Sequence, residues 1–532
     1  MFTRKILAVC VSFAVAGCSV SPEKISQEEI RTVVESDVKQ LSEHPPIMGS
    51  VDLDDAIARG LLHNREKQLK SLEAALAQGQ ISLVQHEMLP SLTASAGYSK
   101  RDEYAASASV NFTDGEPDAL SSDPAYSVSQ ERERYTTDVA FSWNVLDFGL
   151  SYVRAKQHAD RYLIAKERER KVVHNITQDV RAAYWRAVSA ERLLVKINPL
   201  IQDVNEALGQ SRQVENRQLR SPLEALHYQR ELLDILRALQ SIRQDLIGAK
   251  TELASLMGLK PGTQFKLADV DAPSFKVPEL ELQLELMEEL ALNQRPELKE
   301  TLYNQRISAA ETKAALIDML PGINLTAGVY HDSNEYLLNQ DWTSLGAQVS
   351  WNLFDVFSFS AERNMAKTRE ALAEQQRLAT SMAVLTQVHL SRIRYQQAVN
   401  TYDLAGDYLQ VALRINEQTE NSAQARRSTQ LDMIRESLNT VLAELRRDVA
   451  YAEVQNSYGR LFVTMGMDLV PEDYTHLSLE ALSDQVGSRF SSWTDGRIDP
   501  IQEVRESAPA GGIEDDVEDS DPTNDSEEDA WS

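Results

Sequence analysis

Cysteine is nearly absent from this sequence, which has only Cys10 and Cys18 in 532 residues. A disulfide framework is therefore excluded. Long hydrophobic runs are also missing. The first candidate, an eleven-residue stretch from Ile6 to Ala16, is too short for a helix that spans a bilayer.

Positive charge is scarce as well. The chain has 54 Lys and Arg against 81 Asp and Glu, for a formal net charge of -27. This balance argues against a nucleic-acid partner, because a phosphate backbone requires clustered Lys and Arg. Ten of the acidic residues lie between Glu514 and Asp529 with no basic residue among them. We therefore expect residues 506–532 to be an acidic, disordered tail.

Catalytic motifs are lacking too. The sequence has no phosphate-binding loop, no glycine-rich dinucleotide turn, no nucleophile elbow and no His-Glu zinc helix. Its nine histidines are scattered, and His158 and His174 are interpreted as solvent-exposed helix residues. The Ser-x-x-Lys pattern at Ser21 falls in a linker and is attributed to chance. We expect no enzyme activity, no cofactor and no metal site.

The N-terminus resembles a bacterial lipoprotein signal. Arg4 and Lys5 precede the apolar run, and small residues lead to "VAGC", which ends at Cys18. The prediction is a signal peptide over 1–17, acylation of Cys18 and a lipidated linker over 18–50. The alternative is an ordinary signal peptide that happens to contain a cysteine. The resemblance also implies, from Ser19, that the mature chain resides in the outer membrane of a Gram-negative cell.

The chain contains an internal repeat. "SWNVLDFG" from Ser142 recurs as "SWNLFDVF" from Ser350, 208 residues later, and "MGL" from Met257 recurs as "MGM" at the same spacing. Upstream, "LPSLTASAGY" aligns with "LPGINLTAGVY" at a spacing of 231. The first copy therefore contains 23 additional residues, which we interpret as a loop.

Period-two alternation predicts four strands in two hairpins, at about 91–100 and 135–146, and at about 322–331 and 343–354. Each strand has an uncharged apolar face, as in the wall of a membrane β-barrel. The predicted aromatic belt comprises Tyr135, Phe141, Trp143 and Trp351. Two hairpins of a soluble sandwich are the alternative. Because four strands cannot close a barrel, a membrane-spanning chain must oligomerise.

Downstream of each Trp, apolar residues recur at alternating spacings of three and four, which predicts long coiled-coil hairpins at about 151–257 and 359–465. Pro199 lies inside the first and is expected to kink it. The remaining divisions are a first repeat over 51–262, a linker over 263–279, a second repeat over 280–470 and an equatorial C-terminal segment over 471–505.

These phrases, together with "ALNQRPELK" from Ala291 and "LMGLKPG" from Leu256, resemble the TolC family of outer-membrane factors across residues 51–471. The resemblance implies a mainly α fold with a membrane β-barrel. It further implies that three chains together form a twelve-stranded barrel and an α-helical tunnel in the periplasm. It implies no hydrolytic activity. The implied partners are a periplasmic adaptor, an inner-membrane pump and outer-membrane lipid, with the tunnel and tail on the periplasmic side.

The same resemblance places the hairpin tips near 215–224 and 423–432. Leu219, Leu223, Arg427 and Leu431 are the expected adaptor contacts, and Asp432 and Glu224 are candidates for a periplasmic gate. A ring of three carboxylates is a physical cation filter. The alternative is that both acids complement the dipoles of the return helices.

Small-molecule efflux is the expected use of such a duct. Protein or polysaccharide export is a second use of the same fold. A rival of another class is a lipid-anchored coiled-coil scaffold that does not span the membrane, which would account for Cys18 and the heptads but not for the four alternating strands.

Overall fold

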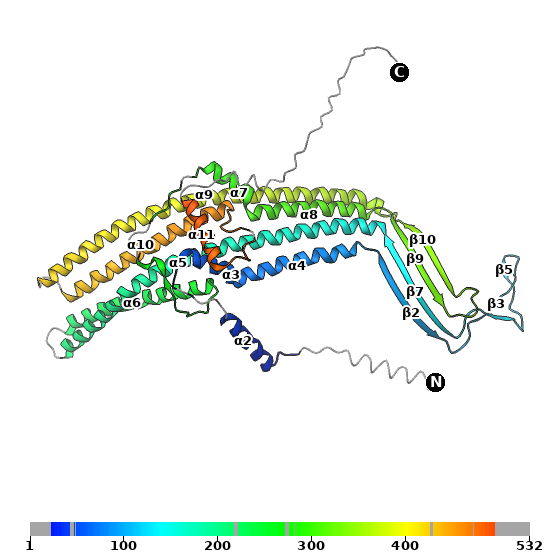
Figure 1. The fold of residues 1–532 in the computed structure, drawn as a ribbon, viewed down its shortest axis with the longest axis horizontal. Helices are drawn as coiled ribbons and strands as arrows, with labels where there is room; N and C mark the ends of the chain where they lie inside the picture. The colour runs from blue at the N-terminus through cyan, green and yellow to red at the C-terminus, as the bar shows by residue number, and fades with distance from the viewer. Residues whose placement is uncertain are drawn as a thin grey trace, which may run out of the picture.

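The structure of the chain, a computed structural model, is long and narrow and mainly helical, with a β-sheet at one end and two helical hairpins at the other (Figure 1). It describes residues 23–42, 47, 49–216, 222–271, 276–280, 282–425, 429–471 and 473–494. The predicted sites Cys18, Leu219 and Arg427 lie outside the described residues, as do the predicted signal peptide and acidic tail.

Four antiparallel strands form the sheet, in the order β10-β9-β7-β2. They are β2 (Ser91–Lys100), β7 (Glu133–Asn144), β9 (Gly322–Asp332) and β10 (Asp341–Ser350). Phe141 lies opposite Leu92 on one side and Ala327 on the other, and Ala327 lies opposite Leu345. Because opposed residues point to the same face, this register gathers the alternating apolar residues of all four strands on one side of the sheet.

The second strand of each hairpin, β7 or β10, ends earlier than the alternation predicts. β7 ends at Asn144, whose Oδ1 accepts hydrogen bonds from the backbone N–H of Leu146 (3.0 Å) and Asp147 (3.3 Å). In the second copy, β10 ends at Ser350, and Asn352 Oδ1 accepts from the N–H of Phe354 (3.2 Å). The Asn of each "SWN" phrase therefore satisfies N–H groups at a helix start, which turns the chain from strand to helix.

Four long helices lead away from the sheet: α5 (Val145–Asn216), α6 (Pro222–Leu256), α9 (Asp355–Gln424) and α10 (Gln430–Met465). α5 continues through Pro199, where we expected a kink, as one helix of 72 residues. At a rise of about 1.5 Å per residue it is roughly 108 Å long. Its seam packs on α6 and α10 through buried residues that include Ile197, Val204, Leu239 and Ile434.

Four shorter helices precede the strands: α3 (Leu53–His63) with α4 (Arg65–Glu87), and α7 (Leu284–Gln294) with α8 (Pro296–Asp318). α4 packs beside α5, α5 beside α8, and α8 beside α9, so the helices next to the sheet follow that lateral order (Figure 1). α4 and β2 therefore lie at one edge of the chain, and α9 and β10 at the other.

The middle of the molecule holds the larger hydrophobic core. The short strands β1 (Ser50–Val51) and β8 (Lys266–Leu267) pair in parallel there, followed by the 3₁₀ turn η1 (Ala268–Asp271). The C-terminal helix α11 (Leu479–Thr494) packs on α3 (Figure 1). Ile57, Val180, Phe462 and Trp493 are buried in this core.

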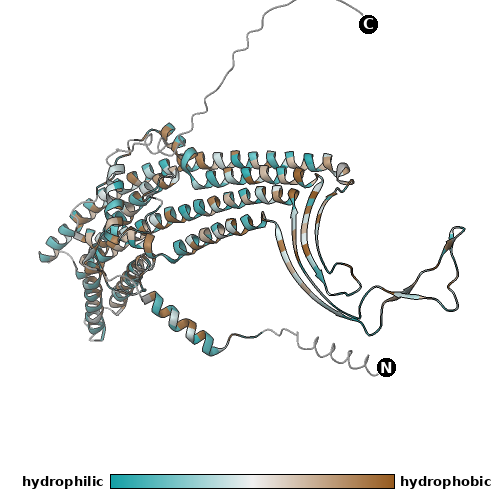
Figure 2. Cartoon of the chain, turned by 45° about the vertical axis from the view of Figure 1, so that its right-hand side comes forward, coloured by the Kyte–Doolittle hydropathy of each residue, from teal (hydrophilic) through white to brown (hydrophobic). Residues whose placement is uncertain are grey.

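The insertion between β2 and β7 is more ordered than the loop that we expected. β3 (Ala106–Ala108) pairs with β6 (Tyr126–Val128), and β4 (Phe112–Thr113) pairs with β5 (Glu116–Pro117). Together they make a narrow projection beyond the end of the sheet (Figures 1 and 2). The other segment that stands off the body is α2 (Gln27–Ser42), near the N-terminus.

Candidate functional site

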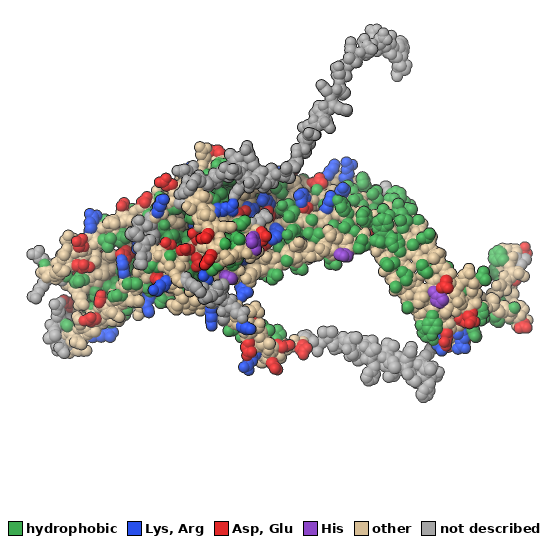
Figure 3. Space-filling view, in the orientation of Figure 1, with side chains coloured by type: hydrophobic (Ala, Val, Ile, Leu, Met, Phe, Trp, Pro, Cys, Tyr) green, Lys and Arg blue, Asp and Glu red, His purple; other side chains and the backbone are tan. Residues whose placement is uncertain are grey.

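The apolar face of the sheet has aromatic rings toward both of its ends. At the end far from the helices, Tyr98 and Tyr135 lie on paired strands with ring centroids 4.9 Å apart. At the helix end, Trp143 meets Phe148 edge to face at 5.9 Å. Hydrophobic side chains cover much of the sheet and the adjoining helix ends in the space-filling view (Figure 3). The hydropathy colouring marks hydrophobic residues at intervals along the strands (Figure 2).

The residues of the predicted aromatic belt lie on β7 and directly after the end of β10. Tyr135 is 58% exposed and Trp351 is 50% exposed, while Phe141 and Trp143 are half-buried. Trp351 Nε1 donates to the Met319 carbonyl (3.1 Å), which satisfies the polar atom of a ring whose body is exposed. Their function as a membrane belt stays a prediction.

Asp432, the first gate candidate, sits in the first turn of α10 in a capping box. Its N–H donates to Thr429 Oγ1 (3.2 Å), and its Oδ2 accepts from the Thr429 N–H (3.0 Å) and hydroxyl (2.7 Å). These hydrogen bonds from Thr429 hold the pKa of the Asp432 carboxyl below its usual range. The carboxylate therefore stays charged at neutral pH and also starts the return helix.

A basic side chain lies between two acidic side chains near the same tip. Arg435, one turn after Asp432, has Nη1 3.7 Å from Asp432 Oδ1, and its Nη2 pairs with Glu231 Oε1 on α6. This side chain links the two hairpins. Glu224, the second gate candidate, and Leu223 are exposed in the first turn of α6, and Leu431 is half-buried at the start of α10. Their roles as gate and adaptor contacts stay predictions.

Sequence reasoning missed a charged cluster in the middle of the molecule. Asp468 accepts from Arg170 Nε (2.7 Å) and lies 2.7 Å from His174 Nε2. Although burial alone would raise the pKa of Asp468, the hydrogen bonds from His174 and Arg170 hold it below its usual value. The interpretation of His174 as a solvent-exposed residue is wrong, because the side chain is buried in this cluster. Its partner lies 294 residues away, a distance that no local pattern spans.

A second buried charge holds α11 in place. Arg181 on α5 is 2% exposed, and its guanidinium lies 3.7 Å from the ring centroid of Phe490 on α11. Asp54 on α3 lies under Gly487 of the same helix, since a Cβ at Gly487 would come 2.5 Å from Asp54 Oδ2. Burial, with the neighbouring Asp52 charge, raises the pKa of Asp54 to about 6 despite the opposing effect of Arg181.

We expect Asp54→Asn to stabilise the protein at pH 7.5 and to have little effect near pH 4. A carboxyl whose pKa is higher in the folded state contributes stability that is complete below its unfolded value, near 3.8, and is lost as the pH rises through about 6. The gain at pH 7.5 is roughly 1–2 kcal/mol per chain after allowing for partial exposure. Thermal unfolding of both proteins between pH 4 and 8 checks this. Equal pH profiles would contradict it.

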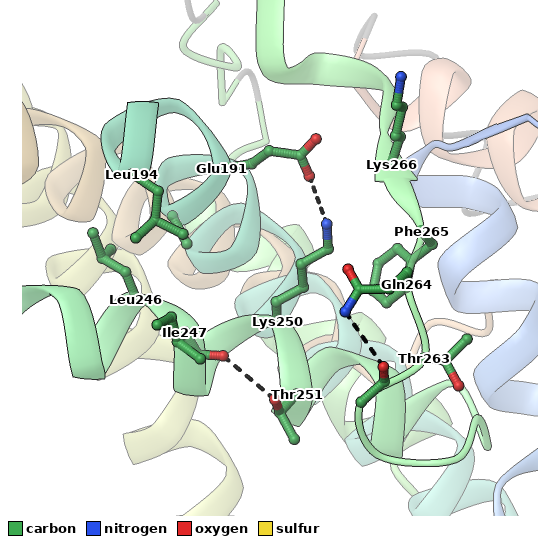
Figure 4. A pocket seen from close by; sticks show the side chains of 12 residues that line it. Glu191, Leu194, Leu246, Ile247, Lys250, Thr251, Thr263, Gln264, Phe265 and Lys266 are labelled. Atoms are coloured by element: carbon green, nitrogen blue, oxygen red, sulfur yellow. Dashed lines mark hydrogen bonds and ion pairs between the residues drawn. The ribbon is translucent and has the colours of Figure 1, made fainter. Parts of the chain in front are cut away.

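An open groove of about 680 Å³ lies between α5, α6 and the loop over residues 262–266 (Figure 4). Two of its charged residues are paired with each other: Lys250 Nζ lies 3.0 Å from Glu191 Oε2 and 4.9 Å from the centroid of the Phe265 ring. The groove is remote from both the sheet and the hairpin tips, and we assign it no part in the proposed function.

None of the helices in the described ranges is long and apolar enough to cross a membrane. Over the same part of the chain, no three His, Cys, Asp or Glu side chains are grouped so that they could hold a metal ion.

No protein-family model matches the sequence. Among curated proteins, it is 23% identical over 480 residues to the cation efflux system protein CusC of Escherichia coli O6:H1, covering 86% of this chain and 93% of that protein. It is 24% identical over 405 residues to the probable outer membrane lipoprotein SilC of Salmonella typhimurium, covering 71% and 78%.

Solved structures share the fold. The Campylobacter jejuni CmeC outer membrane channel superposes with a TM-score of 0.61 at 11% identity, covering 88% of this chain and 97% of that one. A crystal structure of CusC gives 0.59 at 17%, covering 80% and 96%. The chain is similar in sequence to these efflux proteins and has the fold of outer-membrane factor channels of the TolC type. The resemblance inferred from its repeated phrases is confirmed, and the expected location in the outer membrane agrees with these relatives.

Proposed function

We propose that this chain is the passive exit duct of a tripartite export system, and that it catalyses no reaction. The observation that carries the proposal is the sheet: four strands with one continuous apolar face, joined directly to helices of 70 and 72 residues. An apolar sheet face suits lipid, and long helices with wide polar faces suit an aqueous tunnel.

The dimensions of the apolar face support a membrane wall. Tyr135 and Trp143 lie eight residues apart on β7, near opposite ends of that face. At about 3.4 Å per residue they are roughly 27 Å apart, close to the ~25 Å apolar band of outer-membrane barrels.

Both edges of the sheet support a ring of chains. β2 and β10 each have a neighbour on one side only within the described residues. An unpaired edge in lipid costs several kcal/mol per backbone group, so β2 of one chain must meet β10 of the next. Three chains of four strands then give a closed wall of twelve strands.

Helices beside the sheet support the same ring. α4 carries an exposed stripe of leucines along the edge of the chain, and α9 exposes large apolar residues along the other edge. The leucines of α4 are Leu69, Leu72, Leu76 and Leu83. A monomer in water would leave this apolar surface uncovered, whereas the ring buries it.

We propose small solutes, metal cations included, as the cargo. One relative is named a cation efflux protein, and Asp432 at the tip supplies a negative charge that favours cations. Adaptor contact by the hairpin tips follows from the same arrangement, with Leu223 and Leu431 in the first turns of α6 and α10. Acylation of Cys18 would hold the N-terminal segment at the periplasmic leaflet.

Single-channel recording in a planar bilayer tests the duct and its gate together. We expect cation-preferring pores from the wild type and a severalfold higher conductance from Asp432→Ala, because this change removes both the charge and the carboxylate of the capping box. Asp432→Asn is the matched control, since its amide oxygen can still accept from the Thr429 N–H.

We expect Asp432→Asn to lose cation preference with a smaller rise in conductance. Equal selectivity in all three proteins would remove Asp432 from the gate while leaving the duct intact. Absence of pores from a folded oligomer would overturn the duct and favour a scaffold held by lipid alone.

A further inference from the structure

The N-terminal helix α2 is amphipathic, and all of its residues from Gln27 to Leu41 are exposed. Its large apolar residues recur at helical spacing and form one stripe. They are Ile30, Val33, Val34, Val38 and Leu41. The helix is tied to the body at its C-terminal end, where Arg65 Nη2 donates to the Gln40 carbonyl (3.2 Å). The C-terminal end of α2 is therefore attached at the α4 edge of the chain.

The charges of α2 favour a protein surface over a lipid surface. The helix has four acidic residues and two basic ones, and one of the latter, Arg31, is paired with Glu35 at 2.9 Å. Helices that lie on membranes are rich in Lys and Arg on their polar face, because lipid surfaces are anionic. An acidic amphipathic helix calls instead for an apolar surface bordered by basic residues.

One stretch of α9 has this composition. Between Gln375 and Tyr402 there is no Asp or Glu, although the whole chain carries a net charge of -27, and the stretch contains Arg377, Arg392 and Arg394. Large apolar residues recur there at helical spacing, and Leu378, Met382 and Ile393 are exposed. This stripe is complementary to α2 in both apolarity and charge.

The lateral order of the helices decides whether α2 can contact α9 of its own chain or α9 of a neighbouring chain. In a single chain α4 and α9 lie at opposite edges of the lateral order α4, α5, α8, α9. In the ring of the proposed function, on which this inference rests, the α9 edge of the next chain comes beside α4. We propose that α2 is an inter-subunit clasp that docks its apolar stripe on the 375–402 stretch of α9 in the neighbouring copy.

The register of this contact follows from the repeat. α4 and α8 both have 23 residues and lead to the same sheet, so their starting points lie at the same height along the molecule. Arg295, at the start of α8, contacts Gln387 of α9, and rotation about the ring axis keeps height unchanged. The α2 end at Gln40 thus faces the level of Gln387 in the neighbour.

The two helices then run parallel. α2 must point its N-terminus toward the membrane for an acylated Cys18 to reach lipid, and α9 also begins at the sheet. Val34 lies six residues closer to the membrane than Gln40, a rise of about 9 Å, and Met382 lies five residues closer than Gln387, a rise of about 7.5 Å. Val34 and Met382, which are 50% and 65% exposed, are therefore the predicted contact.

Disulfide trapping tests the clasp in the full-length protein in detergent. The double variant Val34→Cys with Met382→Cys is oxidised, and its products are separated without reductant. The chain suits this test because Cys18 is its only natural cysteine after the predicted cleavage. The matched control is Glu35→Cys with Met382→Cys, which moves the thiol to the polar face of α2.

We expect covalent dimers and trimers from the Val34 pair, formed at least tenfold faster than from the Glu35 pair. A disulfide confined to monomers, or equal rates for both pairs, in a preparation that is trimeric by native mass, would overturn the clasp and leave the ring standing. A preparation that is monomeric by native mass would overturn the ring and the clasp together.

Discussion

Gly466→Ala is expected to prevent accumulation of the assembled protein, and Gly258→Ala to do nearly the same. These are the glycines of the "MGM" and "MGL" phrases. Each closes a return helix at a positive φ, 75° for Gly466 and 73° for Gly258. A Cβ at Gly466 would lie 2.7 Å from the backbone nitrogen of Arg295, and one at Gly258 would lie 2.9 Å from the backbone oxygen of His63.

Neither clash can be relieved by rotating a side chain, because both involve backbone at a junction between two helices. Left-handed strain and overpacking, each about 1–3 kcal/mol, add at one position. Immunoblotting of outer-membrane fractions and trimer melting in detergent measure the effect. Gly406→Ala is the control: Gly406 lies inside α9 with nothing within 4 Å of its Cβ position, so alanine there should be neutral or stabilising by up to about 1 kcal/mol. Wild-type levels of Gly466→Ala would contradict the prediction.

Leu72→Glu combined with Leu76→Glu is expected to abolish the proposed trimer while leaving each chain folded. The two leucines are 69% and 66% exposed on the edge helix α4, so the charges cost little in a single chain. In the ring the same positions face the neighbour, where an unpaired carboxylate costs several kcal/mol. Three such interfaces would be affected at once.

Native mass measurement and circular dichroism in detergent separate the two effects. We expect helical content to be unchanged and the mass to fall from three chains to one. Gln78→Glu adds a charge to the same helix at an exposed position outside the leucine stripe, and should leave the trimer intact. A stable trimer of the double variant would show that α4 faces water in the assembly and would remove one support of the ring.

The sequence predicted best what is periodic and local. Alternation over 91–100 predicted a strand, and β2 occupies those residues, because one apolar face repeats every second position. α4 was not predicted, since its leucines lie at the chain edge and its core contacts are few, such as Ala74 and Val84. Its apolar pattern fits the neighbouring chain that the proposed ring places beside it.

Site residues were harder for a different reason. Asp432 was located by its place after the tip, but its capping box with Thr429 and the position of Arg435 between two acids depend on how two hairpins pack. Arg181 and Phe490 lie 309 residues apart in the chain, and no recurring motif links the two positions. Their contact depends on where α11 docks. Such pairs depend on tertiary packing and leave no local signal in the sequence.

The projection formed by residues 101–132 has a consequence for the outer mouth of the proposed duct. Because the two halves of the chain are alike, three chains would build a wall of pseudo-sixfold symmetry, but only the first hairpin of each carries this insertion. The mouth is therefore threefold. Each projection holds seven acidic and two basic residues, a net charge of -5, so three of them would surround the exit with a net charge of -15. Cations would be concentrated at this opening within about 10 Å of the surface, and anions outside would be repelled from it.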